Sequence, residues 1–118
     1  MAAIAPKRLA KKIIKLIWGK KAEDIALLNL KKLSSVTDYF VICSVGSDTQ
    51  ARVVADAVLE GLHDRQIVSH VEGYETGRWV LIDCFSVVLH IFMPEVREYY
   101  GLERLWGDAE REEYPDGV

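Results

Sequence analysis

Two polar residues interrupt apolar segments in the second half of the chain. Asp83 lies in the segment 79–84 and His90 lies in the segment 86–93. Both segments are short and rich in apolar residues, and Pro94 follows the second, which is typical of strands. A carboxylate and an imidazole on neighbouring strands could orient one another for proton transfer or assist a serine nucleophile. On an otherwise apolar strand, each of these side chains must be hydrogen-bonded, exposed to solvent or engaged in function.

A second candidate for chemistry is the turn Gly46-Ser47, which precedes a predicted helix. Such a turn can bind phosphate through the free N–H groups at the helix start. Similar Gly-Ser turns form the first part of the active site in nucleotidyltransferases. Those enzymes also need paired acidic residues to hold Mg²⁺, whereas Asp83 stands alone on its strand. Ser47 followed by Gln50 instead matches a capping box. A nucleotide-binding enzyme using Ser47 and Asp83 therefore stays as an alternative hypothesis.

The sequence predicts no metal site and no cofactor. His63, His70 and His90 have no metal-ligand spacing with the two cysteines, Cys43 and Cys84. The cysteines lie in apolar segments without a CxxC motif, which indicates buried thiols of a cytoplasmic protein. No apolar run approaches the roughly 18 residues that a membrane span needs. We therefore expect a cytoplasmic protein without a membrane partner.

The composition is that of one soluble globular domain: 118 residues, 50% hydrophobic and 28% charged. We expect a single domain over residues 1–109 and an acidic, flexible tail over residues 110–118. The net charge of −3 argues against sequence-independent nucleic-acid binding. Charge is nevertheless polarised, because residues 1–21 hold seven Lys and Arg and no acid. An RNA-binding module that uses this basic segment is a third hypothesis, which the acidic remainder disfavours.

The hydrophobic pattern predicts the order helix, strand, strand, helix, strand, strand, strand, helix. The last two strands are too close for anything but a hairpin, whereas the second strand, its helix and the third strand have the length of a crossover unit. The fold class is α/β or α+β, with a mixed five-stranded sheet flanked by helices. The expected elements are a helix at 6–18, strands at 24–30 and 38–45, a helix from 47 to about 65, strands at 67–72, 79–84 and 86–93, and a helical segment from 94.

Large amphipathic aromatic residues gather around the predicted hairpin and the segment that follows it. Trp, Tyr and Arg are the residue types that dominate protein–protein hot spots. The alternative is that several of these side chains belong to the core. For Trp79, which shares a strand face with Asp83, an interface is the favoured interpretation. The residues concerned are Tyr74, Trp79, Tyr99, Tyr100 and Trp106, with Arg78, Arg97 and Arg104 between them.

Several runs of the sequence resemble the family of the ribosomal silencing factor RsfS, also called the Iojap family. They are SSVTDYFVICS, VEG before WVLIDC, and VVLHIFMPEVREYYGLERLWGDA, and the resemblance extends over about 9–109. It implies a nucleotidyltransferase-like fold without catalytic acids, and no enzymatic activity. It further implies binding to the large ribosomal subunit through ribosomal protein L-fourteen. Bound there, members of the family sterically block joining of the small subunit and so repress translation; organelle relatives act in large-subunit assembly.

The resemblance also implies a partner-binding surface. Trp79 corresponds to a tryptophan of the family's ribosomal contact, and nearby positions are expected to extend that contact. The family usually has a Gly-Asp-like turn between the last two strands, where this chain has Phe85-Ser86. An exposed Phe85 could extend the interface or mediate formation of a homodimer. The expected partner-binding residues are Trp79, Leu81, Asp83, His90, Phe92, Tyr99, Tyr100 and Glu103.

Overall fold

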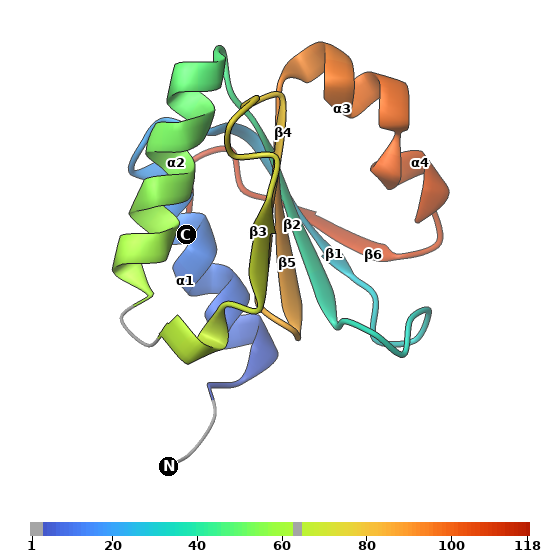
Figure 1. Ribbon diagram of the computed structural model, residues 1–118. Coiled ribbons are helices and arrows are strands. Elements are labelled where there is room, and N and C mark those ends of the chain that lie inside the picture. Colours follow the sequence, from blue (N-terminus) through green and yellow to red (C-terminus); the bar gives the residue numbers. More distant parts are fainter. Residues whose placement is uncertain (1–3, 63–64) are drawn as a thin grey trace.

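A computed structural model describes residues 4–62 and 65–118, which form one sheet with helices on both faces (Figure 1). His63, which the sequence analysis excluded as a metal ligand, lies outside the described residues. The elements are α1 Pro6–Trp18, β1 Glu23–Asn29, β2 Tyr39–Ser44, α2 Asp48–Gly61, the 3₁₀ turn η1 Arg65–Ile67, β3 His70–Glu72, β4 Trp79–Asp83, β5 Val87–Phe92, α3 Pro94–Tyr100, α4 Leu102–Leu105 and β6 Glu110–Glu113.

The sheet is mixed, as the sequence predicts, and its strand order is β3-β4-β5-β2-β1-β6. β4 and β5 form the expected antiparallel hairpin, whereas β2 and β5 are parallel neighbours. β3 pairs with β4 at the edge of the sheet and not with β2. The crossover through α2 therefore passes over two strand positions before the hairpin brings the chain back beside β2.

The expectation of five strands is wrong, because the sheet has six. Residues 110–113, assigned from sequence to a flexible tail, form β6 and pair antiparallel with β1, with Ala26 opposite Glu113. All four residues of β6 are exposed and charged, so the sequence carries no apolar alternation that would predict a strand. The strand is formed by backbone hydrogen bonds with β1, and no side-chain pattern in this segment indicates it.

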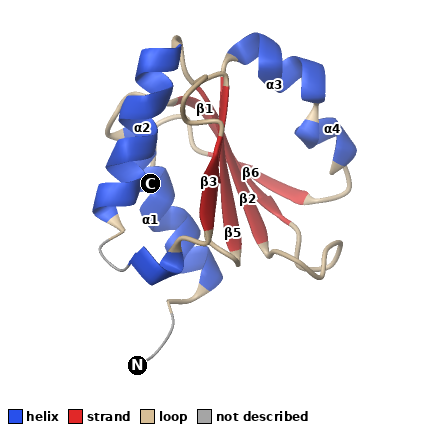
Figure 2. Ribbon diagram, viewed as in Figure 1, coloured by secondary structure: helices blue, strands red, loops and turns tan. Residues whose placement is uncertain are grey.

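Helices α1 and α2 cover one face of the sheet, and α3 and α4 lie over the opposite face (Figure 2). The apolar residues of α1 recur at helical spacing, and Leu9, Ile13 and Ile17 are buried against the sheet. The capping box of α2 is confirmed, since the Ser47 hydroxyl accepts a hydrogen bond from the Gln50 amide at 3.0 Å. The Gln50 side chain accepts in turn from the Gly46 amide at 2.7 Å, so this turn begins a helix.

A partly buried arginine holds α3 and α4 against the sheet. Arg97 of α3 donates two hydrogen bonds to the Glu103 carboxylate, at 2.8 and 2.9 Å. Its third nitrogen donates to the Asp24 carbonyl at 2.8 Å and to the Ser44 hydroxyl at 2.9 Å. Arg111 of β6 also lies 2.8 Å from Glu103. The hydrogen bond from Arg97 lowers the pKa of Glu103, so the carboxylate stays charged in this network.

Replacing Arg97 with alanine is expected to lower the free energy of unfolding by about 3 kcal/mol, because a largely buried carboxylate loses its main partner. Urea unfolding followed by circular dichroism measures the change. Arg52→Ala provides the matched control, since Arg52 pairs with Asp48 one turn away and donates to the Glu75 carbonyl at 3.0 Å, both at the protein surface. Solvent screens that pair, so its loss is expected to change the free energy of unfolding only slightly. Equal losses in the two variants would contradict the structural role assigned to Arg97.

Candidate partner-binding face

The face of the sheet opposite α1 and α2 carries most of the residues predicted to bind a partner. Side chains of a strand alternate between the two faces, and the hairpin register sets Trp79 opposite Phe92 and Leu81 opposite His90. Asp83 follows on the same face of β4. The structure therefore brings together the five predicted strand residues. Trp79, Leu81 and Asp83 are partly exposed, whereas His90 and Phe92 are only 3% and 1% exposed and form the floor.

Aromatic rings cover this surface, which we call the aromatic face: Phe40, Trp79, His90, Phe92, Tyr100 and Trp106. The Trp79 ring lies 4.8 Å from the rings of both Phe92 and Tyr100, measured between centroids. Phe40 packs edge-on against His90 at 4.5 Å and contacts Trp106 at 6.1 Å. Sequence reasoning missed Phe40, although its spacing from the buried Ile42 on the same strand would have placed it on this face.

The protonation pattern of the His90 ring is determined by one hydrogen bond. The indole N–H of Trp79 donates to Nδ1 of His90 at 3.1 Å. Nδ1 therefore carries no proton, and in the neutral ring the proton resides on Nε2. Burial lowers the pKa of His90 from 6.5 to about 3, because desolvation penalises the charged imidazolium. His90 is a neutral side chain at physiological pH.

The pairing of Asp83 with His90 considered from sequence does not form. Asp83 lies opposite Val88 in the hairpin, whereas His90 lies opposite Leu81. The Asp83 carboxylate instead accepts a hydrogen bond from the Phe85 amide at 2.8 Å and so closes the hairpin turn. This turn places Phe85 at a positive φ of 64° with 61% of the residue exposed.

Tyr99 and Tyr100 sit at the end of α3 and are 79% and 54% exposed, so both are free to contact a partner beside Trp79. Glu103 differs from the other predicted residues, because its carboxylate is bound by Arg97 and Arg111. Tyr74, also noted in the aromatic cluster of the sequence, packs with the core beneath α1 and α2 and donates its hydroxyl hydrogen to Asp56.

Beside the rings, the aromatic face is indented by a hollow of about 570 Å³, which we call the sheet hollow. Phe85 and Val36 stand on its rim and are 61% and 86% exposed. Exposed apolar side chains around a concave surface are typical of a protein-binding site. The inner lining consists of Thr37, Phe40, Leu81, Val88, His90 and Trp106.

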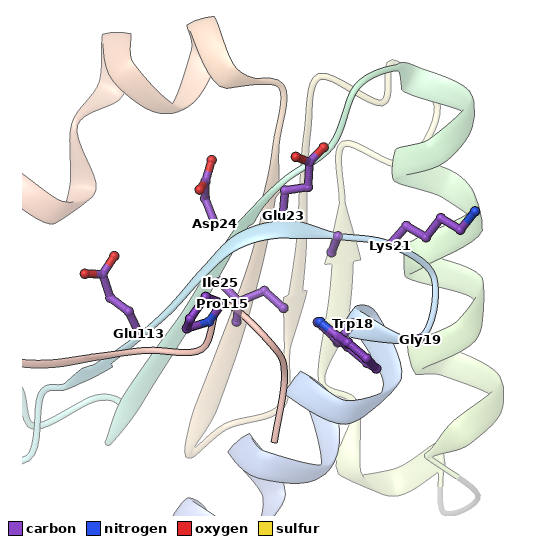
Figure 3. A pocket seen from close by; sticks show the side chains of 9 residues that line it. Trp18, Gly19, Lys21, Glu23, Asp24, Ile25, Glu113 and Pro115 are labelled. Atoms are coloured by element: carbon purple, nitrogen blue, oxygen red, sulfur yellow. The ribbon is translucent and has the colours of Figure 1, made fainter.

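Another hollow, of about 860 Å³, lies between the end of α1, the start of β1 and the C-terminal segment (Figure 3). Trp18 lines it from α1, Asp24 from β1 and Pro115 from the C-terminal segment. None of the eight residues predicted to bind a partner lies in this lining. The aromatic face, and not this hollow, is therefore the candidate site.

The groups that would serve a nucleotidyltransferase are engaged in local structure. Ser47 caps α2 and Asp83 closes the β4–β5 turn. Within residues 4–62 and 65–118, no cluster of three or more His, Cys, Asp or Glu side chains could hold a metal ion. No helix in the described part of the chain is long and apolar enough to cross a membrane. Fold and site together define a small α+β module with a partly exposed aromatic face and no catalytic constellation among the described residues.

Comparison with known proteins identifies the family. The sequence model described as ribosomal silencing factor during starvation, RsfS, matches residues 3–117. The chain belongs to this family, which includes the Iojap proteins and consists of non-enzymatic, ribosome-binding regulators of translation. The resemblance noted in the sequence is thereby confirmed.

The relatives cover most of the chain. Ribosomal silencing factor RsfS of Bacillus subtilis is 44% identical over 91 residues, which are 76% of this chain and 77% of that protein. The mouse protein named mitochondrial assembly of ribosomal large subunit protein 1 is 30% identical over 98 residues, 80% of this chain and 43% of its own. The crystal structure of a Chromobacterium violaceum protein, 32% identical, superimposes with a TM-score of 0.84 over 88% of each chain.

Lowering the pH from 6.5 to 4 is expected to destabilise the fold through His90. The unfolded chain takes up a proton near the ordinary pKa of 6.5, whereas the folded chain does so only near 3, so protonation favours unfolding throughout this interval. Each pH unit costs up to about 1.4 kcal/mol of unfolding free energy. Urea unfolding at several pH values measures this slope.

His90→Asn is the reference variant for this measurement, because its side-chain oxygen can still accept from Trp79 but does not titrate. The difference between the two pH profiles isolates the contribution of His90, since the carboxylates are common to both proteins. Parallel profiles from pH 6.5 to 4 would show that His90 is not held neutral in the folded state.

Proposed function

We propose that this protein binds the large ribosomal subunit through its aromatic face, contacts ribosomal protein L-fourteen there, and sterically blocks joining of the small subunit. The observation that carries the proposal is the Trp79 ring, held rigidly at a partly exposed position in a member of the ribosomal silencing family. The mouse relative's name refers to assembly of the ribosomal large subunit, which supports the large subunit as the partner.

The aromatic face is suited to binding because its proposed anchor, Trp79, is positioned before a partner arrives. Trp79 is fixed by its hydrogen bond to His90 and by contacts with Phe92 and Tyr100. A side chain that is already immobile loses little conformational entropy on binding, so more of the burial energy contributes to affinity. A buried aromatic anchor surrounded by contacts that exclude water is the usual structure of a hot spot.

Blocking subunit joining requires bulk and position, and no catalytic group. The protein measures 36 × 33 × 26 Å along its principal axes. A body of this size, bound on the surface where the two subunits meet, leaves no room for the small subunit. The repression we propose therefore depends only on affinity for the large subunit and on where the aromatic face docks.

A role in large-subunit assembly is the second candidate, and the name of the mouse relative favours it. Assembly and silencing would use the same contact, so binding data alone do not separate them. In the assembly case, loss of the protein would leave immature large subunits to accumulate. In the silencing case, loss of the protein would let mature large subunits form normally, but they would join small subunits more readily during starvation.

Trp79→Ala is expected to weaken binding to purified large subunits by about 2 kcal/mol, or roughly 30-fold, the loss typical of a hot spot. Co-sedimentation over a range of protein concentrations measures the affinity. The matched control is Trp18→Ala, which removes a 47% exposed tryptophan that lines the other hollow. Tyr99→Ala probes the same face without touching His90, and circular dichroism verifies the fold. Unchanged affinity in both Trp79→Ala and Tyr99→Ala would exclude the aromatic face.

Protein bound to large subunits in advance is expected to reduce the yield of joined ribosomes when small subunits are added. Sucrose-gradient sedimentation at constant Mg²⁺ measures this yield, and the Trp79→Ala protein at the same concentration serves as the control. Co-migration with large subunits and an undiminished yield of joined ribosomes would contradict steric blocking and favour the assembly role.

A further inference from the structure

Two polar side chains that line the sheet hollow each have a buried atom without a hydrogen-bond partner in the described part of the protein. In the described part of the chain, the buried side-chain atoms without a partner are Nε2 of His90 and the hydroxyl oxygen of Thr37. His90 is 3% exposed and Thr37 is 7% exposed, and both line the sheet hollow. Leaving such a group unpaired costs about 1–3 kcal/mol, so their coincidence in one hollow calls for a physical reason.

The chemistry of the two atoms specifies what could pair with them. Because Nδ1 of His90 accepts from Trp79, Nε2 carries the proton and is a neutral donor. The Thr37 hydroxyl can donate or accept. The hollow therefore offers one hydrogen-bond donor and one hydroxyl that can donate or accept. Its apolar walls come from Phe40, Leu81 and Val88. A group that accepts a hydrogen bond and carries no charge fits this lining.

The charges at the edge of the hollow restrict the occupant further. Glu72 and Asp83 line it from β3 and β4, and His70 lies between them, 2.9 Å from Glu72 and 3.9 Å from Asp83. Two carboxylates at the edge repel a phosphate or another carboxylate, so a nucleic-acid backbone is disfavoured. An uncharged peptide group of a protein has the required carbonyl acceptor and N–H donor.

We propose that the sheet hollow receives a backbone segment of the protein to which the aromatic face docks, with a peptide carbonyl accepting from Nε2 of His90 and the Thr37 hydroxyl pairing with the same segment. This rests on the proposed function, since it assigns a second contact to the same partner. Nε2 of His90 is covered in the unbound protein, and the partly buried Phe40 ring lies 4.5 Å from the imidazole between centroids. The proposed contact therefore requires Phe40 to change rotamer on docking. Such rotamer changes are common at interfaces.

The proposed contact separates binding from stability in an unusual way. When a polar side chain has a structural role, removing its polar group lowers the stability of the whole protein. The Thr37 hydroxyl has no partner inside the protein, so Thr37→Val removes an unsatisfied group and leaves the melting temperature unchanged or higher. The same substitution is expected to weaken large-subunit binding by about 5- to 10-fold, because the docked segment loses a hydrogen bond.

The experiment measures melting temperature and affinity for purified large subunits on one set of variants. Thr37→Ser keeps the hydroxyl and is expected to bind like the wild type. Thr49→Val makes the same change as Thr37→Val at an exposed position on α2, and it should alter neither quantity. His90→Asn keeps an acceptor for Trp79 but lacks a donor at the position of Nε2, so its affinity should fall even where its fold is intact.

The outcomes distinguish this inference from the proposed function. Weaker binding by Trp79→Ala with wild-type binding by Thr37→Val and by folded His90→Asn would overturn the hollow as a contact and leave the aromatic face standing. Unchanged binding by Trp79→Ala and Tyr99→Ala would overturn the proposed function itself. Purified large-subunit ribosomal RNA is the second probe. If Thr37→Val lowered the affinity for this RNA as much as for the subunit, the occupant would be nucleic acid and the peptide assignment would be wrong.

Discussion

The helices over the aromatic face depend on one partly buried guanidinium. Arg97 joins the Glu103 carboxylate, the Asp24 carbonyl and the Ser44 hydroxyl, so one side chain connects α3 and α4 to the ends of β1 and β2. Arg111 extends the network to β6. A guanidinium suits this position because its planar donors satisfy several acceptors at fixed angles. The helices that carry Tyr100 and Trp106 to the sheet are held in place by it.

A second constraint operates within the aromatic face, where a histidine stands on an otherwise apolar strand. Burial keeps the His90 ring neutral, and the hydrogen bond from Trp79 determines which nitrogen is protonated. The ring therefore orients the proposed anchor while one of its own nitrogens stays unpaired. A fold optimised for stability alone would satisfy or replace such a donor, and retaining it is consistent with a surface that is completed by a partner.

Family membership and physical structure lead to the same kind of protein. The turn before α2 resembles a phosphate-binding turn, but it is closed by the Ser47 and Gln50 side chains. The carboxylate that an enzyme would use is committed to the hairpin. Ser47 and Asp83, the residues that an enzyme of this fold would use, thus have structural roles. Aromatic rings are among the partly exposed groups of the sheet face. This arrangement is expected of a regulator that acts by occupying a surface.

The sequence alone determined the family, the mixed sheet, the capping box and the common face of Trp79, Leu81 and Asp83, because these follow from local motifs and from alternation along a strand. The tertiary structure decided what depends on segments far apart in the chain. The charged segment 110–113 becomes a strand only because β1 offers it an open edge. The Glu103 carboxylate is held by Arg97 and Arg111, and Asp83 does not reach His90 because the hairpin register sets Asp83 opposite Val88. Pairings of this kind are set by register and packing, which no local pattern records.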